Sequence, residues 1–220
     1  MRSFDEIETI AADRHGGMDA LREKIGTLAD PTGLSDDRIL AEFTKNIFRA
    51  GFNWKVVDAM WPGFEQAFHG FDIGRCAFMN DDWFDELIKD TRIVRHGAKI
   101  ESVRDNAIFL QELAREHGQT AAKTLIDWPA DDFVGLLDLL KTRGSRLGGN
   151  TGAYALRFLK IDGFILSRDV VARLVAEGVI DKAPTSKTAR RKAQDAFNTW
   201  REQSGKSLIE ISRVLALSTG

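Results

Sequence analysis

Apolar residues recur at intervals of three and four positions along most of this 220-residue sequence. That spacing puts them on one face of an α-helix, whereas a half-buried strand needs alternation at every second position. No segment shows a sustained alternation of that kind. The pattern therefore predicts an all-α fold, a bundle of helices without a sheet. The segments with the helical spacing are residues 39–48, 83–88, 103–113, 133–140, 153–159, 170–175 and 209–217.

Polar residues and glycines predict where these helices begin and end. Ser, Thr, Asp or Asn residues precede several of the apolar runs, as helix N-cap residues do. These starts are expected at residues 35–37, 80–82, 127–132 and 185–186. Breaks are expected at Pro62-Gly63, Gly70, Gly144, Gly148-Gly149 and Gly205. We expect residues 1–220 to form one domain, with a cleft between two helical lobes.

Charge is distributed unevenly along the sequence, although the formal net charge is only −2. Residues 1–42 hold ten acidic and five basic side chains, whereas residues 141–173 hold seven basic and two acidic ones. A cluster of basic residues on a mildly acidic protein is typical of a surface that binds the phosphate backbone of nucleic acid. An ordinary solvated surface would have the same composition, so charge alone leaves both interpretations open.

The single cysteine limits the chemistry of the chain. Cys76 has no partner for an internal disulfide, and one thiol cannot supply a thiolate zinc cage. Its apolar neighbours predict a buried, small hydrophobic side chain. No uninterrupted apolar run approaches the ~18 residues of a membrane span, and the N-terminus lacks the apolar core of a signal peptide. We expect a cytoplasmic protein that has no contact with membranes.

Residues 141–151 predict a basic, glycine-rich turn between two helices, the second beginning at Thr151 or just before it. Gly148 and Gly149 allow backbone to approach a phosphate closely, and the next helix N-terminus offers unpaired N–H groups. Arg143 and Arg146 can add contacts to phosphate that do not depend on base sequence. An ordinary corner between two helices is the alternative interpretation.

The central part of the chain resembles the DNA-3-methyladenine glycosylase I family, within the helix-hairpin-helix superfamily of base-excision glycosylases. The likeness extends from about residue 40 to about residue 173. It implies an all-α fold and a nucleotide flipped out of the duplex, because the glycosidic bond of a stacked base is inaccessible. The segments that carry it are Ala50-Gly51-Phe52-Asn53-Trp54, Phe64-Glu65-Gln66-Ala67-Phe68, Phe71-Asp72, Ile93-Val94-Arg95-His96-Gly97-Ala98-Lys99-Ile100 and Asn106-Ala107.

The resemblance implies a base-binding role for three residues. Trp54 matches the family tryptophan that stacks on the extruded base, and an indole face attracts a cationic alkylated adenine. Packing in the core is the alternative for Trp54. The family glutamate that hydrogen-bonds the base lies eight residues before that tryptophan, where this chain has Asn46. Glu42 lies one helical turn earlier and can reach the same cavity, so the base selectivity of this chain is open.

The resemblance also implies roles around the turn at residues 141–151. The segment from Leu147 to Thr151 is similar to the superfamily hairpin that holds the DNA backbone. Asp169, followed by an arginine at residue 173, resembles the superfamily arrangement that stabilises the cationic deoxyribose. An N-cap role, accepting N–H bonds from residue 171 or 172, is the alternative for Asp169. Bifunctional members have a lysine where this chain has Asn150, so we predict no lyase chemistry.

Many family members carry a zinc site of two cysteines and two histidines. This chain has one cysteine and four histidines without ligand spacing, so we predict no metal and no other cofactor.

The sequence thus favours a monofunctional DNA glycosylase that excises alkylated purines, 3-methyladenine above all. The expected partner is double-stranded DNA that contains alkylated bases, bound by a monomer near the bacterial nucleoid. A non-enzymatic helix-hairpin-helix protein that binds damaged DNA is the first alternative, because Asn46 replaces the family glutamate. A helical interaction domain without a DNA role is the second.

Overall fold

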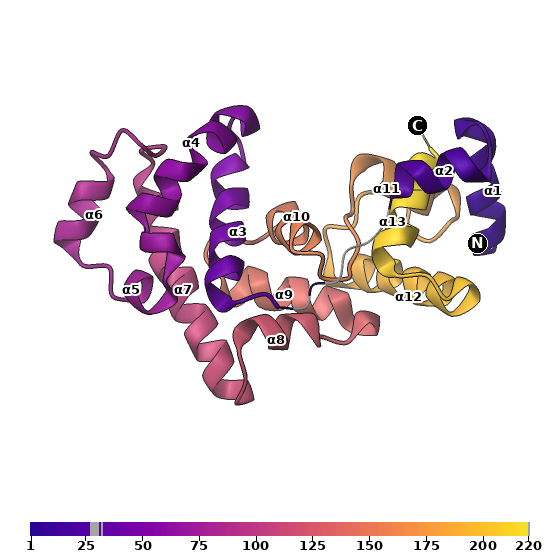
Figure 1. The fold of residues 1–220 in the computed structure, drawn as a ribbon. Helices are drawn as coiled ribbons and strands as arrows, with labels where there is room; N and C mark the ends of the chain where they lie inside the picture. Colours follow the sequence, from indigo (N-terminus) through magenta and orange to yellow (C-terminus); the bar gives the residue numbers. More distant parts are fainter. Residues whose placement is uncertain (27–30, 32, 220) are drawn as a thin grey trace. The chain divides into compact units, whose positions relative to one another are not determined.

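Helices joined by loops make up the described part of the chain, residues 1–26, 31 and 33–219 of a computed structural model (Figure 1), and no strand occurs in it. The all-α prediction is therefore confirmed. The chain divides into two compact units. The central unit comprises Pro31–Asp127 and Leu136–Leu159, and the terminal unit comprises Met1–Asp30, Trp128–Gly135 and Lys160–Gly220. That these units form the single domain expected from the sequence, with a cleft between lobes, stays a prediction.

Helix α3 lies at the centre of the central unit, where it packs against α7 and α10. Its buried residues include Phe43, Ile47 and Phe48, which are shielded from water on the side that faces its neighbours. Burying such side chains contributes about 1.5–3 kcal/mol each, so this packing stabilises the unit. The elements are α3 (Asp36–Arg49), α4 (Trp54–Ala67), η1 (His69–Phe71), α5 (Ile73–Ala77), α6 (Asp81–Leu87), α7 (Gly97–His117), α8 (Ala121–Ile126) and α10 (Asn150–Phe158).

The terminal unit joins both ends of the chain. Helix α13 packs against α1, α2, α11 and α12, and the fully buried Trp200 and Phe197 of α12 lie in its core. The indole N–H of Trp200 donates to the backbone oxygen of Arg2 at 3.1 Å. The elements are α1 (Phe4–His15), α2 (Met18–Ile25), η2 (Ala130–Asp132), α11 (Arg168–Ala176), α12 (Lys187–Ser204) and α13 (Leu208–Leu217). Helix α9 (Phe133–Arg143) contributes to both units.

Most predicted helix boundaries are confirmed, because the capping residues act as expected. Ser35, Asn80 and Ser186 each accept a backbone N–H bond at the start of α3, α6 and α12. Gly205 ends α12 in the left-handed conformation. The sequence Pro31-Thr32-Gly33 also favours a break in the N-terminal part, and Thr32 lies outside the described residues.

The predicted break at Pro62-Gly63 is wrong, because α4 continues through both residues. Proline removes one backbone donor from a helix, but the flanking aromatic side chains hold this one in place. Phe64 packs edge-on against Phe48, with ring centroids 4.7 Å apart, and stacks on Trp61 at 5.3 Å. A glycine is needed at residue 63 for a separate reason, because a Cβ at Gly63 would lie 2.3 Å from the backbone oxygen of Arg92. The glycine permits close packing and does not end the helix.

Cys76 is fully buried, and its thiol lies 3.6 Å from the backbone oxygen of Phe68. Burial, reinforced by the carboxylates of Asp72 and Asp37, raises the pKa of the thiol to about 12. Cys76 is therefore a packed, unreactive side chain, as the sequence predicts. None of the helices among the described residues has the length and apolar character needed to cross a membrane.

Candidate functional site

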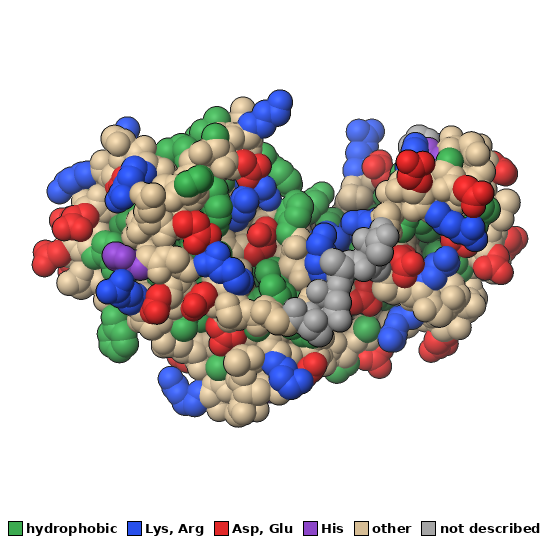
Figure 2. Space-filling view, in the orientation of Figure 1, with side chains coloured by type: hydrophobic (Ala, Val, Ile, Leu, Met, Phe, Trp, Pro, Cys, Tyr) green, Lys and Arg blue, Asp and Glu red, His purple; other side chains and the backbone are tan. Residues whose placement is uncertain are grey.

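Trp54 is the most prominent exposed aromatic side chain near the predicted site. It is the first residue of α4 and is 43% exposed, so the interpretation of Trp54 as a core residue is wrong. Tyr154 and Phe158 of α10 approach it edge-on, with ring centroids 6.1 and 6.2 Å away. Apolar side chains reach the surface in the region of α3, α4 and α10 (Figure 2). The three rings form an aromatic cluster on which a planar group can stack.

Arg49, which the sequence analysis did not single out, supports this cluster. Its guanidinium carbon lies 4.9 Å from the Trp54 ring centroid and 5.2 Å from that of Phe158. Arg49 is 9% exposed, and it donates a 2.5 Å hydrogen bond to Asp58. A buried guanidinium held by a carboxylate and two rings has little freedom, so it fixes the orientation of Trp54. Its position seven residues after Glu42, on the same helical face, was an available signal.

Glu42 and Asn46 form a hydrogen-bonded pair on α3. The Asn46 amide nitrogen donates to the Glu42 carboxylate at 2.6 Å and to the Glu42 backbone oxygen at 3.0 Å. Burial raises the pKa of the Glu42 carboxyl, against the hydrogen bond from Asn46 and the charges of Lys45 and Arg49. Both amide protons of Asn46 thus point to acceptors on Glu42, which leaves its side-chain oxygen as the acceptor for a ligand.

The hairpin loop, residues 144–149, connects α9 to α10. Helix α10 begins at Asn150, as the sequence predicts within a residue, and its N-cap is Gly149 with φ 62° and no capping side chain. Backbone oxygens of the hairpin loop take the place of a capping side chain, because the N–H groups of Thr151 and Gly152 donate to Gly148 and Leu147 at 3.4 and 3.2 Å. The positive φ at Gly149 is a conformation that favours glycine.

A hollow of about 370 Å³ lies beside this loop. Lys99 and Arg146 supply two cations to it, and neither forms an ion pair within the described part of the chain. Lys99 donates to the backbone oxygens of Phe48 and Ala50, and burial together with the charge of Arg146 lowers the pKa of its ammonium group. Two cations at the start of a helix together favour an anion. The lining residues are Ile47, Ala50, Lys99, Arg146, Gly148 and Thr151.

Asn106 holds the hairpin loop against α7. Its side-chain amide donates to the backbone oxygen of Ser145 at 3.0 Å and accepts from the backbone N–H of Ser145 at 2.8 Å. Asn106 is fully buried, so this paired contact is protected from water. The sequence places Asn106 only within the Asn106-Ala107 segment of the resemblance, because the contact that defines its role is to a residue 39 positions away.

Arg143 is placed differently from Arg146. Its guanidinium donates two hydrogen bonds to Glu116, at 2.6 and 2.8 Å, and one to Glu112 at 3.3 Å. These contacts anchor the end of α9 to α7. The expected phosphate contact of Arg143 stays a prediction, and it would have to compete with two carboxylates.

Asp169 belongs to the terminal unit, unlike the other predicted site residues. It is exposed in the first turn of α11. The N-cap interpretation is wrong, because Ser167 occupies that position and accepts the N–H of Val170 at 3.3 Å. The arginine four residues later, Arg173, is buried and pairs with Glu177 at 3.2 Å. The Asp169 side chain forms no ion pair among the described residues.

Part of this site lies in a segment that is similar to known proteins. Residues 32–128 match a family model described as methyladenine glycosylase. DNA-3-methyladenine glycosylase 1 of Escherichia coli (strain K12) is 27% identical in an alignment 136 residues long, which covers 53% of this chain and 71% of that protein. Residues 32–128 are thus similar to the methyladenine glycosylase family. The matched segment contains Glu42, Asn46, Trp54, Lys99 and Asn106.

Solved structures of 3-methyladenine DNA glycosylase I share the fold. The enzyme from Staphylococcus aureus has a TM-score of 0.51 at 18% identity, covering 64% of this chain and 85% of that one. A variant of 3-methyladenine DNA glycosylase I in complex with 3-methyladenine has a TM-score of 0.50 at 18% identity, covering 70% and 91%. The hairpin loop and Asp169 lie beyond residues 32–128, so the family match does not assign them.

No group of three or more His, Cys, Asp or Glu side chains in the described ranges is arranged to hold a metal ion. The absence of a zinc site from this protein remains a prediction.

Proposed function

We propose that this protein is a monofunctional DNA glycosylase that removes alkylated purines, such as 3-methyladenine, from double-stranded DNA. The observation that carries the proposal is the exposed Trp54 ring, fixed by Arg49 on the same face of α3 as Glu42 and Asn46, within a segment of methyladenine glycosylase sequence. A damaged base that pairs poorly costs less to extrude from the duplex, and Trp54 offers it a new stacking partner.

Asn46 is proposed to recognise the base in place of the family glutamate. Because Glu42 takes both amide protons, Asn46 presents an oxygen acceptor, as a carboxylate would. An exocyclic amino group, such as that of adenine, is the matching donor. Glu42 then acts by orienting the amide.

The hairpin loop is proposed to hold the DNA backbone beside the extruded nucleotide. Support comes from the hollow lined by Lys99, Arg146 and Thr151 at the start of α10. Such contacts position the duplex without reading its sequence. Asn106 keeps the loop in the required conformation.

Replacing both Lys99 and Arg146 by glutamine tests this backbone contact. We expect the slope of log affinity for duplex DNA against log salt concentration to become less steep by about 1–2 units, because each lost phosphate contact removes about 0.9. Binding measured by fluorescence anisotropy between low and moderate salt gives the slope. The matched control replaces Lys89 and Arg75, which are exposed elsewhere in the central unit. Equal slopes in the two variants would contradict the assignment.

Asp169 is proposed to stabilise the positive charge that develops on the deoxyribose as the glycosidic bond breaks. Its support is an exposed carboxylate without an ion-pair partner among the described residues, at the start of a helix. Alkylated bases are good leaving groups, so no metal or cofactor is needed.

The Asp169→Asn variant is expected to release base about tenfold more slowly, since a carboxylate near a full positive charge contributes about 1–2 kcal/mol in a partly solvated site. Single-turnover release from methylated duplex DNA measures this, with Asp5→Asn, an exposed carboxylate in the first turn of α1, as the matched control. An unchanged rate at saturating enzyme would remove Asp169 from the mechanism.

A non-enzymatic protein that binds damaged DNA remains the second candidate, since Asn46 stands in the place of the family glutamate. The product distinguishes the two. A monofunctional glycosylase leaves abasic sites that break only after alkali treatment, whereas a binding protein leaves none. Strand breaks formed without alkali would instead indicate lyase chemistry.

A further inference from the structure

The terminal unit carries a dense cluster of positive charge that the proposed site does not use. Residues 182–192 contain five basic side chains and no acidic one, although the whole chain has a net charge of −2. We call the surface formed by these five residues the 182–192 surface. They are Lys182, Lys187, Arg190, Arg191 and Lys192.

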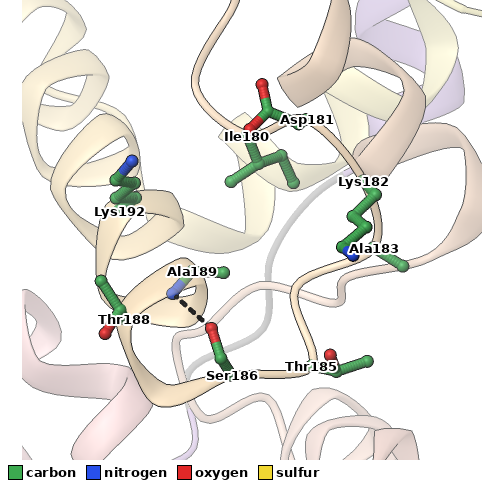
Figure 3. A pocket seen from close by; sticks show the side chains of 9 residues that line it. All are labelled: Ile180, Asp181, Lys182, Ala183, Thr185, Ser186, Thr188, Ala189 and Lys192. Atoms are coloured by element: carbon green, nitrogen blue, oxygen red, sulfur yellow. Dashed lines mark hydrogen bonds between the residues drawn. The ribbon is translucent and has the colours of Figure 1, made fainter.

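The 182–192 surface borders an open hollow of about 420 Å³. The hollow lies between the loop after α11 and the first turns of α12, as Figure 3 shows. Lys182 and Lys192 line it together with the hydroxyl groups of Thr185 and Thr188. The Ser186 hydroxyl is already occupied, because it accepts the Ala189 N–H at 3.1 Å. Cations and hydroxyl groups are the side chains that contact phosphate oxygens.

The lysines of this surface are available to a partner. Lys182, Lys187 and Lys192 are exposed, and none of them forms an ion pair within the described ranges. Arg191 differs, since it pairs with Asp132 at 2.7 Å. Asp181 is the one carboxylate that lines the hollow. The free charge is thus concentrated on three lysines.

The spacing between these three lysines favours binding of an extended anion over binding of a single small one. Lys187 and Lys192 are five residues apart on α12, which is about 7.5 Å along a helix axis. Lys182 precedes the helix on a separate loop. Lys187 does not line the hollow that Lys182 and Lys192 share, so a chain of phosphates can engage all three, whereas a phosphate in the hollow engages two.

We propose that the 182–192 surface binds the phosphate backbone of duplex DNA, as a contact separate from the hairpin loop. This rests on the proposed function in one respect, namely that the polyanion is the substrate duplex. Because the contact is to phosphate, it adds affinity for undamaged and damaged DNA alike and makes that affinity dependent on salt. It does not touch the reacting atoms, so it affects binding and leaves the chemical step unchanged.

The test compares two triple variants with the same loss of charge. One replaces Lys182, Lys187 and Lys192 by glutamine, and the other replaces Lys24, Lys89 and Lys123. All six side chains are exposed, and thermal unfolding verifies that both variants fold. Affinity for an undamaged duplex is measured by fluorescence anisotropy at several potassium chloride concentrations, and base release is measured at saturating DNA.

The proposal predicts that the first variant loses at least tenfold in affinity and about 2–3 units of salt slope, with an unchanged rate of base release at saturation. The control variant should keep the native slope. Equal slopes in the two variants would overturn the proposal, and base release by the native protein would then leave the glycosylase function standing. A reduced slope in the first variant, without base release by the native protein, would support the surface and refute the glycosylase function. Absence of DNA binding by the native protein would refute both.

Discussion

Replacing Trp54 by alanine is expected to slow the release of alkylated base by about 10- to 100-fold, because stacking a base on an aromatic side chain contributes about 1–3 kcal/mol. The ring is 43% exposed and is held in place by Arg49, so its removal eliminates the stacking surface and leaves the core of the central unit intact. The loss should appear in kcat/KM for methylated duplex DNA. Trp54→Phe should retain most of the activity, since it keeps a ring at the same position.

Val56→Ala provides the matched control for Trp54. Val56 lies on the same helix and is 40% exposed, but it takes no part in the aromatic cluster. Thermal unfolding of all three variants separates a folding defect from a lost contact. Base release by the folded Trp54→Ala variant at the native rate would show that Trp54 does not bind the base.

Replacing Arg173 by alanine is expected to destabilise the protein by about 3–5 kcal/mol, because it removes one of the two guanidinium groups that pair with the buried Glu177 and the donor to the buried Ser218 oxygens. Arg173 and Glu177 are each 7% exposed. The Arg173 guanidinium donates to Glu177 at 3.2 Å and to the Ser218 hydroxyl at 2.7 Å. Arg2 completes the network with a 2.8 Å hydrogen bond to Glu177. These contacts join both ends of the chain to α11.

Denaturant unfolding at several pH values measures this effect. Burial by itself raises the pKa of Glu177, but the hydrogen bonds from Arg2 and Arg173 outweigh it and lower that pKa below the ordinary value of 4.5. A carboxyl with a lowered pKa stabilises the fold above its unfolded pKa, and this stability is lost as the pH falls through the folded pKa. The native protein should therefore lose stability below about pH 4.5, and the Arg173→Ala variant should lose less. If the Arg173→Ala variant had the same denaturant midpoint as the native protein at pH 7, the proposed role of Arg173 would be contradicted.

The sequence predicted most helices correctly because apolar periodicity and capping residues agreed. Ser35 starts α3 and Gly205 ends α12 for local reasons that a sequence displays. The error at Pro62 has a different origin. Its helix persists through packing against Phe48, a contact between elements that local propensity does not contain.

The site was predicted less completely than the fold. Resemblance pointed to Trp54 and Asn46, but the burial of Arg49 against Trp54 depends on how α3 and α4 meet. Asn106 clamps a loop 39 residues away, so its function could not be derived from neighbouring residues. Ser167 and Asp169 are both suitable helix caps by residue type, and α11 begins at Arg168, which makes Ser167 the cap.

The most direct test of the central claim is the release of free 3-methyladenine from methylated duplex DNA by the native protein. Chromatography of the soluble products over time identifies the base and gives the rate. A glycosylase predicts 3-methyladenine accumulating with an equal number of alkali-sensitive abasic sites. No release of any methylated purine, with DNA bound and the protein folded, would contradict the glycosylase assignment and favour a protein that only binds damaged DNA.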